Sequence, residues 1–194
     1  MTSETNPWTV LSSERLFEDD FVSFIRHAVR AAAGREGTYS VTRYKQFGVR
    51  ILPIDHEGHT WLVGQFRFAA GAYSWELPSG GGDLGEIPRS AANRELREEI
   101  GFEAAHWLEL NRLAPAGSIL DVRELSFLAW GLAPRPAEAD PQEVLQIRRL
   151  PFGEAVDMAV GGAISNSGTI ATLLMAQAKA RRGELPNDVA PALR

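Results

Sequence analysis

The feature that most constrains this fold is a glycine-rich stretch that passes into a sharply bounded helix, between Gly71 and Gly101. Residues 71–85 are dense in glycine, which tolerates positive φ angles and close backbone approach, so we expect a loop there. Residues 88–100 follow a first-turn proline and are good helix formers, and Gly101 is a typical helix stop. The sequence therefore predicts a glycine loop that leads directly into a helix.

Three glutamates of the predicted helix fall on one of its faces. At about 100° per residue, Glu98 lies about 60° to one side of Glu95, and Glu99 lies about 40° to the other. Leu96 and Ile100 border this face, so the carboxylates lie beside the buried side of the helix. Like charges at this spacing repel, and a divalent cation offsets that repulsion. A solvated acidic helix is the alternative for Glu98 and Glu99 taken alone.

Composition narrows the kind of metal that such a site would hold. The chain has no cysteine, which excludes disulfides, cysteine-bound zinc, iron–sulfur clusters and a catalytic thiol. Its four histidines do not pair at zinc-helix spacing, so we expect oxygen ligands and a hard cation, Mg²⁺ or Mn²⁺. The formal net charge of −5 argues against a nucleic-acid polymer as the main partner.

The rest of the chain alternates strands with helices. Apolar runs predict strands at residues 8–16, 21–30, 39–44, 48–54, 61–66, 106–113, 124–132 and 144–150. Helical spacing predicts helices at 153–160 and 167–182. The apolar stripe expected on the second of these helices is Ile170, Leu173, Leu174 and Ala178. We expect a loose tail over the last eleven residues and, from the order of elements, a mixed α/β sandwich.

The N-terminal residues lack the basic start and apolar run of a signal peptide. No stretch approaches the roughly 18 apolar residues of a membrane span. We therefore expect a cytoplasmic protein that does not act at a membrane.

The segment from Gly80 to Phe102 resembles the signature of the Nudix hydrolases. That signature is Gly-x5-Glu-x7-Arg-Glu-U-x-Glu-Glu-x-Gly-U, where U is an aliphatic or large apolar residue. Its nine positions are matched by Gly80, Glu86, Arg94, Glu95, Leu96, Glu98, Glu99, Gly101 and Phe102. The resemblance implies an α+β fold with a mixed sheet, the Nudix α/β/α sandwich. It also implies an enzyme that hydrolyses nucleoside diphosphates linked to another moiety.

The resemblance also implies roles for individual residues. The Mg²⁺ (or Mn²⁺) ligands would be Glu95, Glu98, Glu99 and the backbone carbonyl of Ser79. The structural positions of the signature would be Gly80, Glu86, Arg94 and Gly101. Among these, Glu86 and Arg94 would lock the loop to the helix.

Flanking segments resemble one branch of the family, the ADP-ribose and nucleotide-sugar pyrophosphatases. These segments are 63–67, 73–81 and 163–169. By this resemblance, residues 1–45 would form an N-terminal β extension that mediates a homodimer. Residues 46–183 would form the hydrolase domain, and 184–194 a C-terminal tail.

Substrate contacts are expected from residues outside the signature. Arg67 is a candidate phosphate contact because a planar guanidinium suits bidentate phosphate binding, and Glu76 is a second candidate. Trp8 is the first candidate to stack on a nucleobase, ahead of Trp61 and Trp75. A surface ion pair is the alternative for Arg67, and core packing is the alternative for the tryptophans.

In this branch an acidic residue after the signature acts as base or as a further metal ligand. Glu143 takes the matching position, although Pro141 stands where a second acidic residue is expected. The alternatives are Glu124, Glu138, Asp140 and the signature glutamates themselves.

The reaction expected from the resemblance is Mg²⁺-dependent attack of water on a pyrophosphate. If the substrate is ADP-ribose, the products are AMP and ribose 5-phosphate. The alternatives are another nucleotide sugar, such as GDP-mannose, or a catalytically silent sensor of nucleotides.

Overall fold

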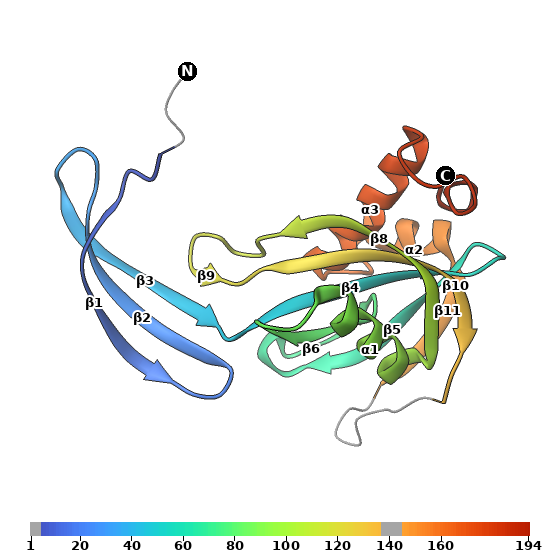
Figure 1. Ribbon diagram of the computed structural model, residues 1–194, viewed down its shortest axis with the longest axis horizontal. Coiled ribbons are helices and arrows are strands. Elements are labelled where there is room, and N and C mark those ends of the chain that lie inside the picture. The colour runs from blue at the N-terminus through green and yellow to red at the C-terminus, as the bar shows by residue number, and fades with distance from the viewer. Residues whose placement is uncertain (1–4, 137–144) are drawn as a thin grey trace. The chain divides into compact units, whose positions relative to one another are not determined.

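The computed structural model describes residues 5–136 and 145–194 (Figure 1). The chain divides into two compact units, which are described separately. Unit 1 comprises residues 1–46 together with 114–122, and unit 2 comprises 47–113 and 123–194. The sequence predicts an N-terminal extension over residues 1–45, but it does not anticipate that 114–122 joins the same unit.

Unit 1 is an antiparallel meander with one added short strand. Its strands are β1 (Thr9–Glu18), β2 (Val22–Arg30), β3 (Glu36–Tyr44) and β9 (Leu120–Asp121). They lie in the order β1-β2-β3-β9, and β9 runs parallel to β3. The turn between β1 and β2 is stabilised by Asp19, whose Oδ1 accepts the backbone N–H groups of Phe21 and Val22 at 2.8 and 2.7 Å. The chain reverses at this acidic segment, residues 18–20, between the two strands.

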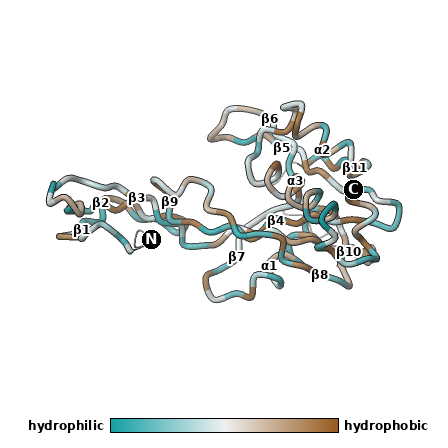
Figure 2. The backbone as a smooth tube through the Cα atoms, turned by 90° about the horizontal axis from the view of Figure 1, so that it is seen from above, coloured by the Kyte–Doolittle hydropathy of each residue, from teal (hydrophilic) through white to brown (hydrophobic). Residues whose placement is uncertain are grey.

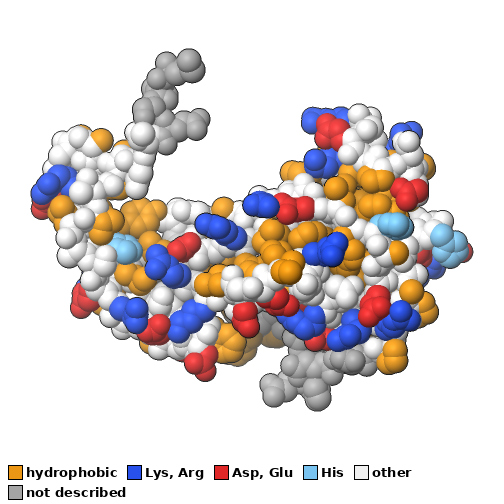
Figure 3. All heavy atoms as spheres, viewed as in Figure 1, with side chains coloured by type: hydrophobic (Ala, Val, Ile, Leu, Met, Phe, Trp, Pro, Cys, Tyr) orange, Lys and Arg blue, Asp and Glu red, His pale blue; other side chains and the backbone are white. Residues whose placement is uncertain are grey.

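Strand β1 is exposed along its whole length. No helix occurs among the described residues of unit 1. Several large apolar side chains of this unit remain exposed, and Figures 2 and 3 show hydrophobic colour along the same strands. They are Trp8, Val10, Leu11, Leu16, Phe17, Phe21, Tyr44 and Ile119. Exposed apolar patches of this kind often mark surfaces that interact with another molecule.

Unit 2 contains two sheets, ordered β7-β4-β10-β8 and β11-β5-β6. The strands are β4 (Gln46–Ile54), β5 (His59–Arg67), β6 (Ala72–Glu76), β7 (Ser79–Asp83), β8 (Phe102–Leu113), β10 (Glu124–Pro134) and β11 (Gln146–Pro151). The helices are α1 (Pro88–Ile100), α2 (Phe152–Val160) and α3 (Ser167–Arg181), with short 3₁₀ turns η1 (Phe68–Ala70) and η2 (Ala190–Leu193). Strands β4 and β10 pair in parallel, which makes the first sheet mixed.

Alternate residues of the central strands face two separate cores. Ile51 of β4 belongs to the cluster that includes the buried side of α1. Its neighbour Leu52 belongs to the cluster that includes α2, α3 and the C-terminal segment. Because successive side chains of a strand point to opposite faces, helices lie on both sides of the sheet layer. The predicted α/β/α sandwich with a mixed sheet is confirmed.

The glycine-rich stretch is not the loop that the sequence predicts. Residues 72–76 form β6 and residues 79–83 form β7, which pairs with β4. The glycines here serve close packing within a strand: a Cβ at Gly82 would lie 2.3 Å from the Phe47 ring and 3.0 Å from Ala91. Composition alone predicted a loop because glycine is depleted in most strands.

The C-terminal residues are also packed, so the expectation of a loose tail is wrong. Leu185, Val189, Ala190 and Leu193 are buried in the same core as α2 and α3. Pro186 and Pro191 interrupt this short segment, which explains why the sequence did not predict its packing. No helix in the described part of the chain is long and apolar enough to span a membrane.

Candidate active site

Helix α1 begins and ends at the predicted residues. Pro88 occupies its first turn, where the missing N–H of proline costs no hydrogen bond. Gly101 terminates it in the left-handed conformation (φ 71°, ψ 38°) and donates its N–H to the carbonyl of Arg97. These bounds place Glu95, Glu98 and Glu99 on the last turns of the helix.

Glu99 ties this helix to strand β7. Its side chain is buried, 6% exposed, and its Oε2 accepts the backbone N–H of Ser79 at 2.9 Å. The bond brings the backbone of Ser79 beside the carboxylate face of α1. The role of the Ser79 carbonyl as a metal ligand stays a prediction.

Arg94 neutralises the other two carboxylates. Its Nη1 donates to Glu95 at 2.7 Å and to Glu98 at 3.1 Å, and its Nη2 donates to the carbonyl of Gly81 at 2.7 Å. Glu86 lies 3.7 Å from the same guanidinium. Burial opposes the charge of Arg94, but the bonds and charges of Glu95 and Glu98 outweigh it and raise the pKa of Arg94 above its usual value. Arg94 thus joins β7 to the helix, in contact with more partners than the predicted pair with Glu86.

Gly80 makes room for one of the glutamates. A Cβ at this position would lie 2.1 Å from Cδ of Glu95 and 2.2 to 2.3 Å from its two oxygens. Any side chain here would therefore displace the carboxylate. The first position of the signature is occupied by glycine for reasons of space, because the φ angle of Gly80 is not positive.

The donor set of this face fits a hard divalent cation. Three carboxylates and one backbone carbonyl are the oxygen ligands that Mg²⁺ and Mn²⁺ accept. The three carboxylates are not gathered around one point, since Glu95 and Glu98 meet Arg94 whereas Glu99 meets Ser79. The glutamates that would hold the cation are thus already tied to groups of the chain.

Arg67 and Glu76 form a bidentate ion pair in the same unit. The Nε and Nη2 atoms of Arg67 donate to the two oxygens of Glu76 at 2.9 and 2.8 Å. Glu76 is only 2% exposed, whereas the side chain of Arg67 is 42% exposed. Both oxygens of Glu76 face Arg67, so the role that we propose for Glu76 changes from substrate contact to support of Arg67.

Burial works against the charged form of Glu76 and by itself raises its pKa. The hydrogen bond and charge of Arg67, the Ser74 side chain and the charge of Arg50 outweigh burial and hold the pKa of Glu76 below its usual value. Glu76 is therefore a carboxylate in the neutral pH range, as its pairing with Arg67 requires.

The three candidate tryptophans lie in different surroundings. Trp8 belongs to unit 1, where it meets Tyr39 edge to face at 6.0 Å beside a hollow of about 250 Å³. Trp61 is buried against Phe102, with ring centres 5.0 Å apart, and packs in the core of α1. Trp75 meets Tyr73 at 5.8 Å in unit 2. Core packing, the alternative expected for these residues, is thus observed for Trp61.

Of the candidate bases outside the signature, Glu124 is the one that lies among the described residues. Glu143, Glu138 and Asp140 lie outside the described residues. Glu124 accepts from Nε and Nη2 of Arg50 at 2.8 and 3.3 Å, and its side chain is 15% exposed. Both carboxylate oxygens of Glu124 are held by Arg50, which favours a structural role for Glu124.

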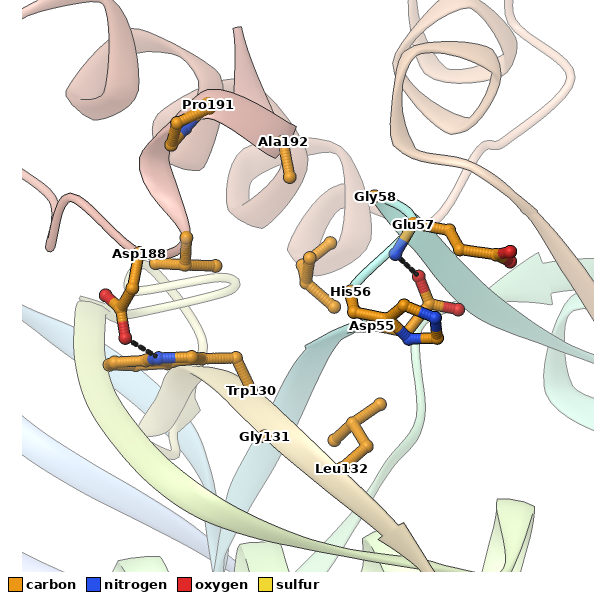
Figure 4. Close-up of a pocket in the computed structure, with 12 residues that line it drawn as sticks. Asp55, His56, Glu57, Gly58, Trp130, Gly131, Leu132, Asp188, Pro191 and Ala192 are labelled. Carbon is orange, nitrogen blue, oxygen red and sulfur yellow. Dashed lines mark hydrogen bonds between the residues drawn. The ribbon is translucent and has the colours of Figure 1, made fainter.

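A separate cavity of about 470 Å³ opens in unit 2 beside the turn that follows β4 (Figure 4). Asp188 accepts the indole N–H of Trp130 at 2.8 Å on one side of it. On the other side, Asp55 and Glu57 both accept from Arg149. The metal-ligand atoms of Asp55, Glu57 and His59 lie within 4.8 Å of one another. Arg149 already neutralises this acidic group, and no residue of the signature lines the cavity.

The sequence did not predict the residues that contact Glu76 from the interior of the protein. Asn166 donates its Nδ2 to Glu76 Oε2 at 3.0 Å, and Nη1 of Arg50 lies 3.9 Å from the same oxygen. Thr169 accepts from Arg50 at 2.9 Å. One signal was present in the sequence: Arg50 interrupts the otherwise apolar run 48–54, and a buried charge needs a partner.

Comparison with known proteins identifies the family. Residues 44–173 match the family model described as NUDIX domain. The chain belongs to the Nudix family. It is a Nudix hydrolase whose similar proteins include ADP-ribose pyrophosphatases, as the flanking segments predicted.

Two curated proteins and one solved structure are among those similar to this chain. An ADP-ribose pyrophosphatase of Mycobacterium tuberculosis is 35% identical over 172 residues, which is 87% of this chain and 82% of the relative. ADP compounds hydrolase NudE of Escherichia coli is 33% identical over 110 residues, which is 57% of this chain and 59% of the relative. A crystal structure of an ADP compounds hydrolase superimposes with a TM-score of 0.83 at 23% identity, covering 95% of this chain and all of that one. This last likeness shows a shared fold.

Proposed function

We propose that this Nudix hydrolase cleaves the pyrophosphate of ADP-ribose to AMP and ribose 5-phosphate in the presence of Mg²⁺. The observation that carries the proposal is the carboxylate face of α1, packed through Glu99 against the backbone of Ser79. The relative from Mycobacterium tuberculosis, which covers most of both chains, supports the choice of ADP-ribose.

The signature residues would hold the divalent cation. Its ligands would be Glu95, Glu98, Glu99 and the carbonyl of Ser79. When bound, Mg²⁺ neutralises phosphate oxygens and makes a nearby water more acidic. Other residues of the chain would position these ligands. Arg94 holds β7 against α1, and Gly80 leaves space for the carboxylate of Glu95.

Arg67 would contact the phosphates. Its guanidinium is partly exposed, and its Nε–Nη2 edge is held by Glu76, so its plane has a defined direction. Glu76 lies three residues before Ser79 in the chain, which links the arginine to the strand that faces α1. A guanidinium of fixed orientation suits bidentate contact with a phosphate.

The remaining roles rest on the resemblance. Glu143 would take the proton of the attacking water, as a loop carboxylate that is positioned after the signature. Trp8 would stack on the nucleobase from a second copy of the chain, and unit 1 would form the homodimer interface through its exposed apolar strands. The cytoplasmic location expected from the sequence stays a prediction.

The experiment that tests this function is a product assay on a panel of nucleotides with Mg²⁺ or Mn²⁺. The panel contains ADP-ribose, GDP-mannose, NADH, a dinucleoside polyphosphate and an oxidised nucleoside triphosphate. We expect AMP and ribose 5-phosphate from ADP-ribose, at the highest kcat/KM of the panel. A higher kcat/KM for GDP-mannose would move the substrate to another nucleotide sugar. Binding without any hydrolysis would instead indicate a nucleotide sensor.

A further inference from the structure

The first two turns of α3 carry a glycine and two threonines on their buried side. Gly168, Thr169 and Thr172 are all buried, and Asn166 caps the helix. A helix stabilised only by core packing would bury apolar side chains here. These buried polar groups therefore require hydrogen-bond partners inside the protein.

Asn166 makes two bonds with opposite ends of its amide. Its Oδ1 accepts the N–H of Thr169 at 2.8 Å, which is an ordinary helix cap. Its Nδ2 donates to Oε2 of Glu76 at 3.0 Å. The helix cap uses only the side-chain oxygen of Asn166. Its NH₂ group is therefore available for a second role, the bond to Glu76.

That donor reaches the carboxylate that orients Arg67. Oε2 of Glu76 accepts from both Asn166 and Arg67, and Oε1 accepts from Nε of Arg67. The Ser74 side chain also hydrogen-bonds this carboxylate. Rotation of the Glu76 carboxylate would break its planar match with the guanidinium. Asn166 opposes that rotation from the inside of the molecule.

Arg50 fixes the same carboxylate from another direction and is itself fixed by α3. It lies 3.9 Å from Oε2 of Glu76 and donates to Glu124 and to Thr169. Gly168 lets the helix come this close, since a Cβ there would lie 2.4 Å from Glu124 Oε1 and 2.7 Å from Arg50 Nε. The charges thus form one connected network from the start of α3 to the exposed Arg67.

We propose that Asn166 is a positioning residue, whose amide donor holds Glu76 so that Arg67 presents its guanidinium to the substrate phosphates. The inference rests on the proposed function of Arg67. The phosphate contact depends on direction, because a guanidinium that is free to turn loses the bidentate geometry.

The variant that isolates this role is Asn166→Ser. Serine is a good helix cap, so it keeps the bond to Thr169, but its hydroxyl is too short to replace the amide that reaches Glu76. We expect a slightly lower melting temperature from the lost bond to Glu76, a KM for ADP-ribose raised about tenfold and a smaller change in kcat. Asn166→Ala should show the same KM and a lower melting temperature, since it loses the cap as well. Ser167→Ala, next to it on the exposed side of the helix, is the matched control.

A double-mutant cycle tests whether Asn166 acts through Arg67. In an Arg67→Ala background, Asn166→Ser should leave KM unchanged, because the guanidinium that it positions is gone. An equal rise of KM in both backgrounds would overturn the proposal. So would a wild-type KM for Asn166→Ser on its own.

A spectroscopic measurement separates this proposal from the proposed function. The Nε–H signal of Arg67, assigned by its loss in Arg67→Ala, should be sharp in the NMR spectrum of the wild type and broadened in Asn166→Ser. An unchanged signal would contradict the positioning role, whatever the enzyme hydrolyses. If the signal broadens but Arg67→Ala leaves KM unaltered, Arg67 is positioned but does not bind phosphate, and the inference fails at that step.

Discussion

Gly80 shows how a residue without a side chain can be required by the side chain opposite. Its signature position is explained by the carboxylate of Glu95, which occupies the space that a Cβ would need. Because φ at Gly80 is not positive, alanine is excluded by contact and not by backbone conformation. The sequence identified the glycine from its spacing, whereas only the structure shows which atom it accommodates.

Gly80→Ala should therefore impair catalysis through Glu95. Overpacking of this kind costs about 1–3 kcal/mol, so we expect kcat/KM to fall about tenfold or more. Gly85→Ala is the control, since no atom lies within 4 Å of its added Cβ. The measurement is kcat/KM of the two variants in steady-state kinetics. Equal values for Gly80→Ala and Gly85→Ala would show that the Glu95 side chain can shift without loss of activity.

Asp55 provides a prediction about pH. Burial raises its pKa, but the N–H of His59, the Arg149 guanidinium and the N–H of Glu57 outweigh burial and lower the pKa below its ordinary 3.8. Its stabilisation is therefore present above that ordinary value and is lost as the pH falls through the lower folded-state pKa. Asp55→Asn should reduce the free energy of unfolding by about 1 kcal/mol at neutral pH. The difference from wild type should shrink in denaturant titrations as the pH falls below the ordinary pKa of 3.8, and a constant difference would contradict this account.

At the scale of elements, the helices were easier to predict than the strands. Helix α1 was predicted residue for residue, because a proline and a glycine bound it. The stripe expected on α3 was wrong in part: Leu174 and Ala178 are exposed, whereas Thr169 and Thr172 are buried. Hydrophobic periodicity cannot find a helix face that packs against an ion-pair network, because the residues on that face are polar or lack a side chain.

The C-terminal segment provides a stability test at this scale. Leu193 is fully buried in the core of α2 and α3. Leu193→Ala should lower the free energy of unfolding by about 2–5 kcal/mol, from lost burial and the cavity left behind. Leu174→Ala, on the exposed side of α3, should cost much less. Similar costs for the two variants in chemical denaturation would show that the segment contributes little.

For the whole molecule, the sequence predicted the layers of unit 2 but not which segments of the chain make up unit 1. Residues 114–122 join the N-terminal meander through β9, which pairs with β3 at only two positions. A two-residue parallel strand has too little periodicity to be read from a sequence. The candidate site follows the same pattern. The signature was found from its spacing and Arg67 from its guanidinium chemistry, whereas the inner supports of Glu76 depend on long-range pairing that no local pattern records.

The apolar strands of unit 1 predict a homodimer. Val10 and Phe17 of β1 are more than half exposed, so two copies that pair here would remove apolar surface from water. We expect wild type to elute at the mass of a dimer in light-scattering chromatography, and Val10→Glu combined with Phe17→Glu to elute as a monomer. Val160→Glu, an exposed valine of unit 2, should remain dimeric. A monomeric wild type would refute the proposed interface.

The central claim is that the carboxylate face of α1 holds the cation for pyrophosphate hydrolysis. The most direct measurement is the rate of AMP release from ADP-ribose by wild type and by Glu99→Gln at saturating Mg²⁺, with melting temperatures recorded for both. Glutamine retains an oxygen that can accept the N–H of Ser79, so the fold should be preserved. The account predicts a turnover reduced about a hundredfold or more at an unchanged melting temperature. A Glu99→Gln enzyme with near wild-type turnover would contradict it.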